Sequence, residues 1–489
     1  MTSAPLQALS QARVDPGARR YQDARIAHWD AVARARSEPS AFGEAYHQRL
    51  REVYGFLVPP GQRVLEIGSG DGSLMAALEP SYGVGVDFSH EAVAAAAHRY
   101  PHLRFVQADA HQLPLDEPFD TVIMSDVLND LWDVQTVFEQ LARLAVPSTR
   151  VIVNTYSRLW EPALAAAGAI GLARPRLRQN WLTVEDVANL LDLAGFEVIR
   201  DWQEVLWPSP TPLVNPLANR LFVKLWPLRF LALTNFIVAR PRAANRPLVD
   251  EPSVSVIVPA RNEAGNIPEV FRRTPRMGRW TELVFVEGHS RDQTYEAIEQ
   301  AIAAHPEWSS QLHRQTGTGK GDAVRLGFSK ASGDILMILD ADLTMPPEDL
   351  PRFYDVLRSG KADFANGVRL VYPMEQQAMR LLNFFGNKFF SLAFPWLLGQ
   401  SVKDTLCGTK ALWKADYDRI AVNRAYFGDF DPFGDFDLLF GAAKLNLKIQ
   451  DVPIRYRDRT YGAPNIDRWR HGALLLQMTL AAARRLKFV

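Results

Sequence analysis

The chain has 489 residues, which is too long for one ordinary hydrophobic core, so its length predicts at least two domains. Hydrophobic residues make up 47% of the chain and charged residues 22%, values that are typical of a soluble globular protein. Lys and Arg together number 55, as do Asp and Glu, and the resulting net charge of zero argues against a general nucleic-acid-binding protein.

The cysteine content and the apolar stretches narrow the class of protein further. A single cysteine, Cys407, excludes a disulfide framework and a thiolate zinc site, and it fits a reducing, cytoplasmic setting. The N-terminal sequence MTSAPLQALSQARVDPG lacks the apolar core of a signal peptide. Charged residues interrupt the apolar stretches 217–239 and 379–399, so neither is expected to cross a bilayer.

A linker divides the chain near its middle. The sequence RPRAANRPLVDEPS, residues 240–253, is rich in proline and charge and has no hydrophobic periodicity. We therefore predict one domain over residues 1–241, a linker over 242–252 and a second domain over 253–489.

The first half contains a glycine-rich turn after an apolar strand. In RVLEIGSGDGSL, the strand over 64–67 is followed by Gly68, Gly70 and Gly72, and then by a helix. Glycines at such a turn let the backbone approach a ligand closely, and an acid at the tip of the next strand, here Asp87, can bind ribose hydroxyls. Later strands end near Asp109 and at Ser125–Asp126. The alternation of strands and helices predicts a doubly wound, parallel α/β sheet with its site at the strand ends.

This order of motifs resembles that of the class I S-adenosylmethionine (SAM)-dependent methyltransferases, over residues 27–241. The loop reads G-x-G-x-G instead of the dinucleotide pattern G-x-G-x-x-G, and Glu66 lies two residues before its first glycine. The resemblance implies a Rossmann-like fold and SAM as cofactor. It also implies that the three glycines line the methionine and ribose, Glu66 orients the loop, Asp87 binds ribose and Asp109 contacts adenine. The segment ARIAHWDAVA, with His28 and Trp29, resembles the N-terminal lid of these enzymes.

The chemistry of the first domain leaves alternatives open. SAM carries an activated methyl group, so a protein base is not obligatory. His111, Asn129 and Asp130 are weak candidates for one. The alternative is a domain that transfers no methyl group and serves as a SAM-binding or docking module.

An apolar segment, residues 216–241, closes the first half. We expect a helix followed by a last antiparallel strand over 235–239. The basic residues among its Trp and Phe side chains also allow contact with a membrane surface.

The second half presents acids at the ends of several strands. SVSVIVPARNE stops at Pro259, ELVFVE ends on Glu287, a glycine-rich loop carries Lys320, and DILMILDADLTMP ends on Asp340 and Asp342. Because alternate residues of a strand point the same way, Asp340 and Asp342 are expected to face one ligand. Paired carboxylates are hard oxygen ligands and suit Mg²⁺ or Mn²⁺ bound to phosphate.

The series resembles the family 2 glycosyltransferases of GT-A fold, in particular the dolichyl- or polyprenyl-phosphate mannosyltransferase-like branch, over residues 252–487. The resemblance implies an inverting transfer from a UDP- or GDP-sugar, with Asp340 and Asp342 holding the metal and the diphosphate. The residues implied for binding the rest of the donor are Pro259, Arg261 and Glu263 around the base, Glu287 at the nucleoside and Lys320 near the phosphates. One departure is the sequence EGHS at 287–290, where the branch usually has two acids before Gly-Ser.

The candidate residues for binding the acceptor follow from the same resemblance. SVKDTLCGTKAL, residues 401–412, occupies the place of an acceptor loop, so Asp404 is a candidate catalytic residue and Lys410, where the family usually has Arg, a candidate phosphate ligand. The sequence FGDFDPFGDFDLL contains four aspartates, one of which is expected to act as the general base if the acceptor is a hydroxyl. The candidates are Asp429, Asp431, Asp435 and Asp437, and we select Asp435 and Asp437 as catalytic candidates. Arg457 and Arg459 are expected to close over the diphosphate or an acceptor phosphate.

Two apolar, basic stretches suggest where the second domain contacts a membrane. Residues 379–400 look like an interfacial helix pair, or equally like an amphipathic helix on the core, and the last helix ends in a basic apolar tip. We therefore interpret the chain as a bifunctional fusion that methylates and glycosylates in one pathway, with a polyprenyl phosphate or a glycan as acceptor and peripheral contact with the cytoplasmic face of a membrane. A soluble glycosyltransferase that acts on a protein or small-molecule hydroxyl is the alternative.

Overall fold

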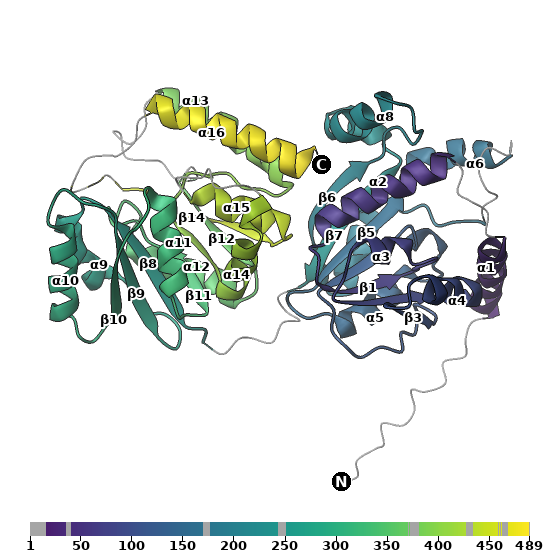
Figure 1. Cartoon of the computed structure of the whole chain (residues 1–489), viewed down its shortest axis with the longest axis horizontal. Coiled ribbons are helices and arrows are strands. Elements are labelled where there is room, and N and C mark those ends of the chain that lie inside the picture. Colours follow the sequence, from purple (N-terminus) through teal and green to yellow (C-terminus); the bar gives the residue numbers. More distant parts are fainter. Residues whose placement is uncertain are drawn as a thin grey trace, which may run out of the picture. The chain divides into compact units, whose positions relative to one another are not determined.

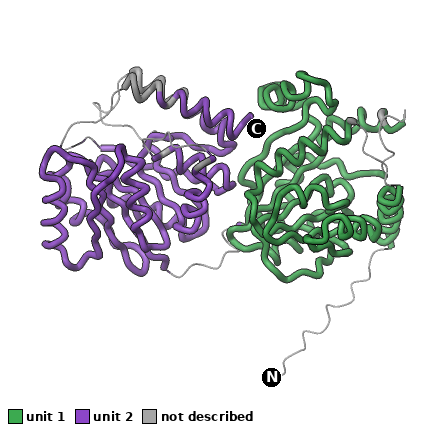
Figure 2. The backbone as a smooth tube through the Cα atoms, in the orientation of Figure 1, with its two compact units in different colours: residues 1–241 green, residues 242–489 purple. Residues whose placement is uncertain are grey.

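The computed structural model describes residues 16–35, 41–169, 177–242, 251–369, 371, 381–426, 434–457, 459, 461 and 468–488. The chain divides into two compact units, residues 1–241 and 242–489, each built around its own sheet (Figures 1 and 2). No helix in the described ranges is both long and apolar enough to cross a membrane.

The first unit is a seven-stranded sheet in the order β3-β2-β1-β4-β5-β7-β6. The strands are β1 (Arg63–Ile67), β2 (Tyr82–Asp87), β3 (Arg104–Gln107), β4 (Thr121–Ser125), β5 (Arg150–Tyr156), β6 (Phe196–Glu204) and β7 (Thr234–Pro241). The main helices are α1 (Pro16–Arg34), α2 (Ala41–Leu57), α3 (Ser73–Ala77), α4 (His90–Arg99), α5 (Val134–Leu144), α6 (Glu161–Ala169) and α7 (Val184–Leu193). Strands β1 to β5 are parallel, and β7 runs antiparallel to β5 and β6. The predicted doubly wound sheet and its last antiparallel strand are confirmed.

Alternate residues of the central strands of this sheet enter two different hydrophobic cores. Leu65 and Val122 join a core with Phe138, whereas Val64 and Ile123 join a core with Tyr54 on the other face. Because helices cover both faces, the central strands are apolar at nearly every position. Polar residues are therefore confined to the strand ends, which is where a site can form.

The second unit is also a seven-stranded sheet, in the order β10-β9-β8-β11-β13-β12-β14. The strands are β8 (Val254–Ala260), β9 (Thr281–Glu287), β10 (Ser309–Arg314), β11 (Ile335–Ile338), β12 (Phe364–Val368), β13 (Lys410–Trp413) and β14 (Ile449–Pro453). The main helices are α9 (Ile267–Arg273), α10 (Thr294–Ala304), α11 (Lys320–Lys330), α12 (Leu350–Arg358), α13 (Leu381–Leu398), α14 (Lys414–Val422), α15 (Asp435–Lys444) and α16 (Arg468–Ala482). Of the two interpretations of residues 379–400, the structure agrees with the helix on the core: α13 is one helix, and its Phe394, Leu397 and Leu398 are buried in the core of the unit.

The strand directions explain where the polar residues of the second unit gather. β8 is parallel to both β9 and β11, with Ala260 paired to Glu287 and Ile257 paired to Ile338. The carboxyl ends of three neighbouring strands therefore meet at one edge of the sheet. β13 runs antiparallel to β11, so the segment before Lys410 arrives at that same edge.

Candidate functional sites

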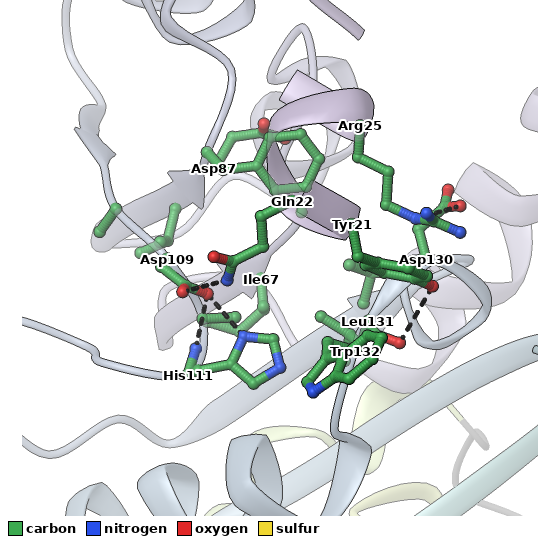
Figure 3. Close-up of a pocket in the computed structure, with 16 residues that line it drawn as sticks. Tyr21, Gln22, Arg25, Ile67, Asp87, Asp109, His111, Asp130, Leu131 and Trp132 are labelled. Carbon is green, nitrogen blue, oxygen red and sulfur yellow. Dashed lines mark hydrogen bonds and ion pairs between the residues drawn. The ribbon is translucent and has the colours of Figure 1, made fainter. Parts of the chain in front are cut away.

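A pocket in the first unit lies at the carboxyl ends of β1, β2 and β4 (Figure 3). Its walls come from the glycine loop, from the strand ends and from helix α1. The lining residues include Gly68, Asp87, Asp109, Val127 and Asp130. The structure thus places two of the three predicted acids in one cavity with the first glycine.

The glycine loop has the backbone that its sequence requires. Gly68, Gly70 and Gly72 have φ values of +74°, +51° and +74°, a region that favours glycine. A side chain at Gly68 would lie 2.6 Å from Val127, whereas one at Gly70 would meet no atom within 4 Å. The backbone at Gly70 therefore borders open space that a ligand can enter.

Three polar groups surround this loop. Asp87 accepts a hydrogen bond from the Gly70 backbone at 2.9 Å and another from the Ser89 backbone, while its burial raises its pKa. Burial also raises the pKa of Glu66 well above its usual value. Glu66 Oε2 and Ser69 Oγ are buried without a hydrogen-bond partner in the described part of the chain. Neither residue is among those that line the pocket.

Helix α1 covers the pocket, but through other residues than those predicted. Gln22 donates to Asp109 Oδ2 at 2.5 Å, and Arg25 pairs with Asp130 at 3.3 Å (Figure 3). Tyr21 completes the contribution of α1 to the lining, whereas His28 and Trp29 are not among the lining residues. The segment that resembles a lid thus lies in a helix that lines the pocket, and its role as a lid stays a prediction.

The weak candidates for a base have structural partners. His111 Nδ1 lies 2.6 Å from Asp109 Oδ1, and its Nε2 accepts from the Asp133 backbone at 3.1 Å, so both ring nitrogens are engaged. Asn129 is fully buried and bonds the Asn180 carbonyl and the Thr155 hydroxyl. None of these side chains is arranged to take a proton from an acceptor.

A different carboxylate lies at the end of β4. Tyr46 Oη donates to Oδ1 and Oδ2 of Asp126 at 2.9 and 3.0 Å, and Asn154 Nδ2 donates to Oδ1 at 2.6 Å. Tyr156 stacks on Tyr46, with ring centroids 5.9 Å apart. The sequence placed Asp126 at a strand end, but nothing in it indicated that Tyr46 and Asn154 converge there.

In the second unit, Lys320 and Asp340 form the centre of the acidic edge. Lys320 Nζ lies 2.5 Å from Asp340 Oδ1. Gly408 packs against this pair, since a side chain at Gly408 would lie 2.1 Å from Lys320 Nζ and 2.2 Å from Asp340 Oδ2. The predicted acceptor loop and the predicted donor site are therefore in direct contact.

Arg459 joins the other two acids of this edge. Its guanidinium donates to Glu263 Oε1 at 2.6 Å and to Asp342 Oδ2 at 2.7 Å, while Thr344 donates to Asp342 Oδ1. Burial raises the pKa of Glu263, and Arg459 offsets this only in part. Arg459 was predicted to hold a phosphate, and here it holds two carboxylates of the donor side.

The remaining predicted donor residues lie along the same strand ends. Glu287 is buried and accepts a 2.5 Å hydrogen bond from the Ser290 backbone. Arg261 is exposed, and Pro259 occupies the penultimate position of β8. Among the described residues, no cluster of three or more His, Cys, Asp or Glu side chains is arranged as a metal site.

Two predicted acceptor residues are buried and contact other protein groups. Asp404 is buried, and its carboxylate accepts hydrogen bonds from Nε and Nη2 of Arg369 at 2.8 and 2.9 Å. Burial acts to raise the pKa of Asp404, but Arg369 outweighs burial and the net pKa lies below its usual range. Lys410 is fully buried, and its ammonium donates to the Cys407 carbonyl, so it does not face an open acceptor site.

The other acceptor candidates are spread over several elements. Asp437 is buried and pairs with Arg424 at 2.7 Å. Arg457 is exposed, and its backbone donates to the Thr344 carbonyl at 2.8 Å, beside the acidic edge. Asp429, Asp431 and the side chain of Asp435 lie outside the described residues.

Comparisons with known proteins assign each unit. Residues 41–201 match the family model described as "Methyltransferase domain", and residues 255–420 match that of "Glycosyl transferase family 2". The chain combines a methyltransferase domain with a family 2 glycosyltransferase domain.

The glycosyltransferase domain resembles curated proteins over part of its length. It is 37% identical to dolichol-phosphate mannosyltransferase of Pyrococcus furiosus over 120 residues, which cover 24% of this chain and 33% of that protein. It is 29% identical to glycosyltransferase AglJ of Haloferax volcanii over 225 residues, 46% of this chain and 69% of the relative. The chain thus spans about a third of the length of the first of these relatives.

Among solved structures, glucosyl-3-phosphoglycerate synthase of Mycobacterium tuberculosis aligns with 20% identity and a TM-score of 0.35, covering 48% of this chain and 81% of that protein. Magnesium protoporphyrin IX methyltransferase of Synechocystis PCC 6803 aligns with 19% identity and a TM-score of 0.28, covering 47% of this chain and 90% of that protein. The matches to the two family models correspond to the two units: one lies within residues 1–241 and the other within 242–489.

Proposed function

We propose that the chain is a bifunctional enzyme, with SAM-dependent methyl transfer in the first domain and metal-dependent sugar transfer in the second. The observation that carries the second activity is the acidic edge of the sheet. Lys320, Asp340 and Asp342 meet there with Glu263 and Arg459, from segments that are far apart in sequence. Charges of both signs at one edge suit a donor that carries a metal ion and a diphosphate.

Asp340 and Asp342 are the residues proposed to hold Mg²⁺ or Mn²⁺. Their oxygens are hard donors, and two carboxylates leave most of the coordination sphere to donor phosphates and water, as these ions prefer. A metal ion bound there would neutralise the negative charge that develops on the leaving nucleoside diphosphate. Lys320 adds a second positive charge beside Asp340. Glu263, Glu287, Arg261 and Pro259 are proposed to position the nucleoside of a UDP- or GDP-sugar.

The pocket of the methyltransferase domain is proposed to bind SAM. The backbone at Gly70 borders open space, and Gly68, Asp87 and Asp109 line the pocket. Asp87 and Asp109 are proposed to bind the ribose and the adenine. SAM supplies the activated methyl group, so the protein has to align the acceptor and exclude water.

We propose Asp126 as the base for a hydroxyl acceptor of the methyl group. It directly precedes Val127, which lines the pocket and packs against Gly68. Tyr46 acts as a positioning residue, because its phenol holds both oxygens of Asp126. Burial raises the pKa of Tyr46 well above its usual value, so Tyr46 remains a donor at neutral pH.

The acceptor of the sugar is proposed to be a polyprenyl phosphate or a glycan built on one. The name of the Pyrococcus relative supports a lipid-phosphate acceptor. Leu476 and Leu480 on α16 are exposed, and the following turn carries Arg484 and Arg485, a combination suited to a membrane surface. A phosphate acceptor is already anionic and needs no base, which agrees with the burial of Asp404 and Asp437 in ion pairs.

Thermal unfolding with nucleotides and SAM analogues tests both activities at their binding step. A ligand that binds only the native state raises its Tm. We expect S-adenosylhomocysteine to raise Tm in wild type but not in Gly70→Arg, and UDP or GDP with Mn²⁺ to raise Tm in wild type but not in Asp342→Asn. A nucleotide shift that is independent of both metal and Asp342 would contradict the proposed donor site. Transfer of labelled sugar from the stabilising nucleotide to a lipid extract then tests the acceptor.

A further inference from the structure

The segment between β6 and β7 in the methyltransferase domain carries a surface of exposed apolar side chains. It folds into short turns that pack successively on one another: α8 (Val214–Pro216), η3 (Leu217–Leu221), η4 (Phe222–Lys224) and η5 (Leu228–Leu231) (Figure 1). Leu213 and Trp226 are each 77% exposed, and Leu217, Phe222, Phe230 and Leu231 are between 42% and 57% exposed. This many exposed apolar side chains within one short segment is typical of an interaction site.

Buried polar side chains anchor this segment. Its buried side chains include Asn219 and Lys224 beside Ala218 and Val223, whereas most of its larger apolar side chains are exposed. Asn219 exchanges two 2.8 Å hydrogen bonds with the backbone of Trp207, and Lys224 pairs with the buried Glu204. Arg49 of α2 bonds both Glu204 and the Asn219 carbonyl. These polar contacts hold the segment on the domain. The exposure of its apolar side chains therefore belongs to the folded structure.

The charge of the segment indicates which kind of partner binds its exposed apolar side chains. Residues 205–233 contain no Asp and no Glu, but they contain Arg220 and Arg229, both exposed. The guanidinium of Arg229 lies 5.0 Å from the ring centroid of Phe230, so charge and apolar surface adjoin. Trp, Phe and Leu side chains next to arginines are the composition of elements that lie in the interface of an anionic bilayer.

We propose that residues 206–232 dock the methyltransferase domain on an anionic lipid bilayer. The apolar side chains enter the boundary between headgroups and acyl chains, and Arg220 and Arg229 contact lipid phosphates. The proposal concerns a surface outside both reaction sites, and it holds whether or not the proposed transfer reactions occur.

Flotation of the full chain with vesicles tests the proposal. We compare vesicles of phosphatidylglycerol and phosphatidylcholine with vesicles of phosphatidylcholine alone. Leu213→Ser/Trp226→Ser is expected to lower the partition coefficient on anionic vesicles by at least about tenfold. Arg229→Gln is expected to lower it severalfold on anionic vesicles and to leave it unchanged on neutral ones. The matched control is Leu193→Ser, which removes a side chain that is 58% exposed on α7.

A labelling experiment reports the contact directly and separates it from binding by the other domain. The single natural cysteine, Cys407, is buried, so an environment-sensitive dye can be placed on Leu213→Cys, with Leu193→Cys as the control position. We expect a blue shift with anionic vesicles at position 213 alone. A Tm and a far-UV circular dichroism spectrum equal to those of wild type show that each variant is folded.

Two results would overturn the proposal. The first is equal vesicle binding by the Leu213→Ser/Trp226→Ser and Leu193→Ser variants together with an unshifted dye at position 213. The second is a dye shift that follows protein concentration without lipid and that disappears when Leu213→Ser/Trp226→Ser converts a dimer to a monomer. In that case a second copy of the chain covers the surface.

Discussion

Arg459 donates a hydrogen bond from Nη2 to Oδ2 of Asp342 at 2.7 Å, across 117 positions of the sequence. The same guanidinium reaches Glu263, and the backbone of Arg457 donates to the Thr344 carbonyl. Arg457 and Arg459 therefore both contact the acidic edge of the sheet. A guanidinium on a proposed metal ligand competes with a metal ion for that carboxylate.

Arg459→Gln should therefore raise the affinity for Mn²⁺ in the absence of nucleotide. A partly exposed ion pair contributes up to about 1 kcal/mol, so we expect a gain of about fivefold. Isothermal titration with Mn²⁺ measures it. Arg457→Gln is the matched control, because it removes an equal charge two residues away without a carboxylate partner in the described contacts of its side chain. An equal gain in both variants would show that only general electrostatics is at work.

Gly408→Ala should weaken binding of the donor nucleotide with its metal. The added Cβ would lie 2.2 Å from Asp340 Oδ2 and 2.1 Å from Lys320 Nζ, so the ends of these two flexible side chains have to shift. A shifted Asp340 carboxylate no longer offers its oxygens at the proposed metal position, which predicts a severalfold loss in nucleotide affinity. Gly55→Ala is the control, since its Cβ meets no atom within 4 Å. Nucleotide binding of Gly408→Ala equal to that of wild type would argue that Asp340 takes no part in the donor site.

The strand ends were predictable because apolar runs that stop at an acid or a glycine identify them locally. This placed Asp87, Asp109, Glu287, Asp340 and Asp342 at the edges of two sheets, as the structure has them. Strands β10 and β14 lack such a signal, because exposed and half-buried residues interrupt their apolar pattern.

The partners of these residues were not predictable, because each depends on tertiary contacts. Nothing near Asp404 in sequence indicates that Arg369, 35 positions away, neutralises it. The burial of Lys410 was not predictable for a related reason: β13 is an inner strand of the sheet, and its position there depends on contacts with strands that are distant in sequence.

The Arg369–Asp404 pair should contribute to stability more than to chemistry. Arg369→Met leaves Asp404 buried without its guanidinium, which is expected to cost roughly 3 kcal/mol or more. Because the folded-state pKa of Asp404 is depressed, its stabilisation is present at neutral pH and is lost as the pH falls below the usual range for Asp. The difference in Tm between wild type and Asp404→Asn should therefore be large at pH 7 and should shrink below about pH 4. A difference that is independent of pH would contradict this assignment.

Methyl transfer should depend on Asp126 and Tyr46 without a matching loss of cofactor binding. Removal of a general base lowers kcat by about 100-fold or more, so Asp126→Asn should approach that loss, and Tyr46→Phe, which only releases the carboxylate, should lose about tenfold. The measurement is transfer of labelled methyl from SAM to a lipid or glycan extract, alongside the affinity for S-adenosylhomocysteine. Tyr82→Phe is the control, because Tyr82 starts β2 at the opposite edge of the sheet and bonds Glu117. If Asp126→Asn and wild type transfer methyl at the same rate over the pH range, alignment alone suffices and the acceptor requires no base.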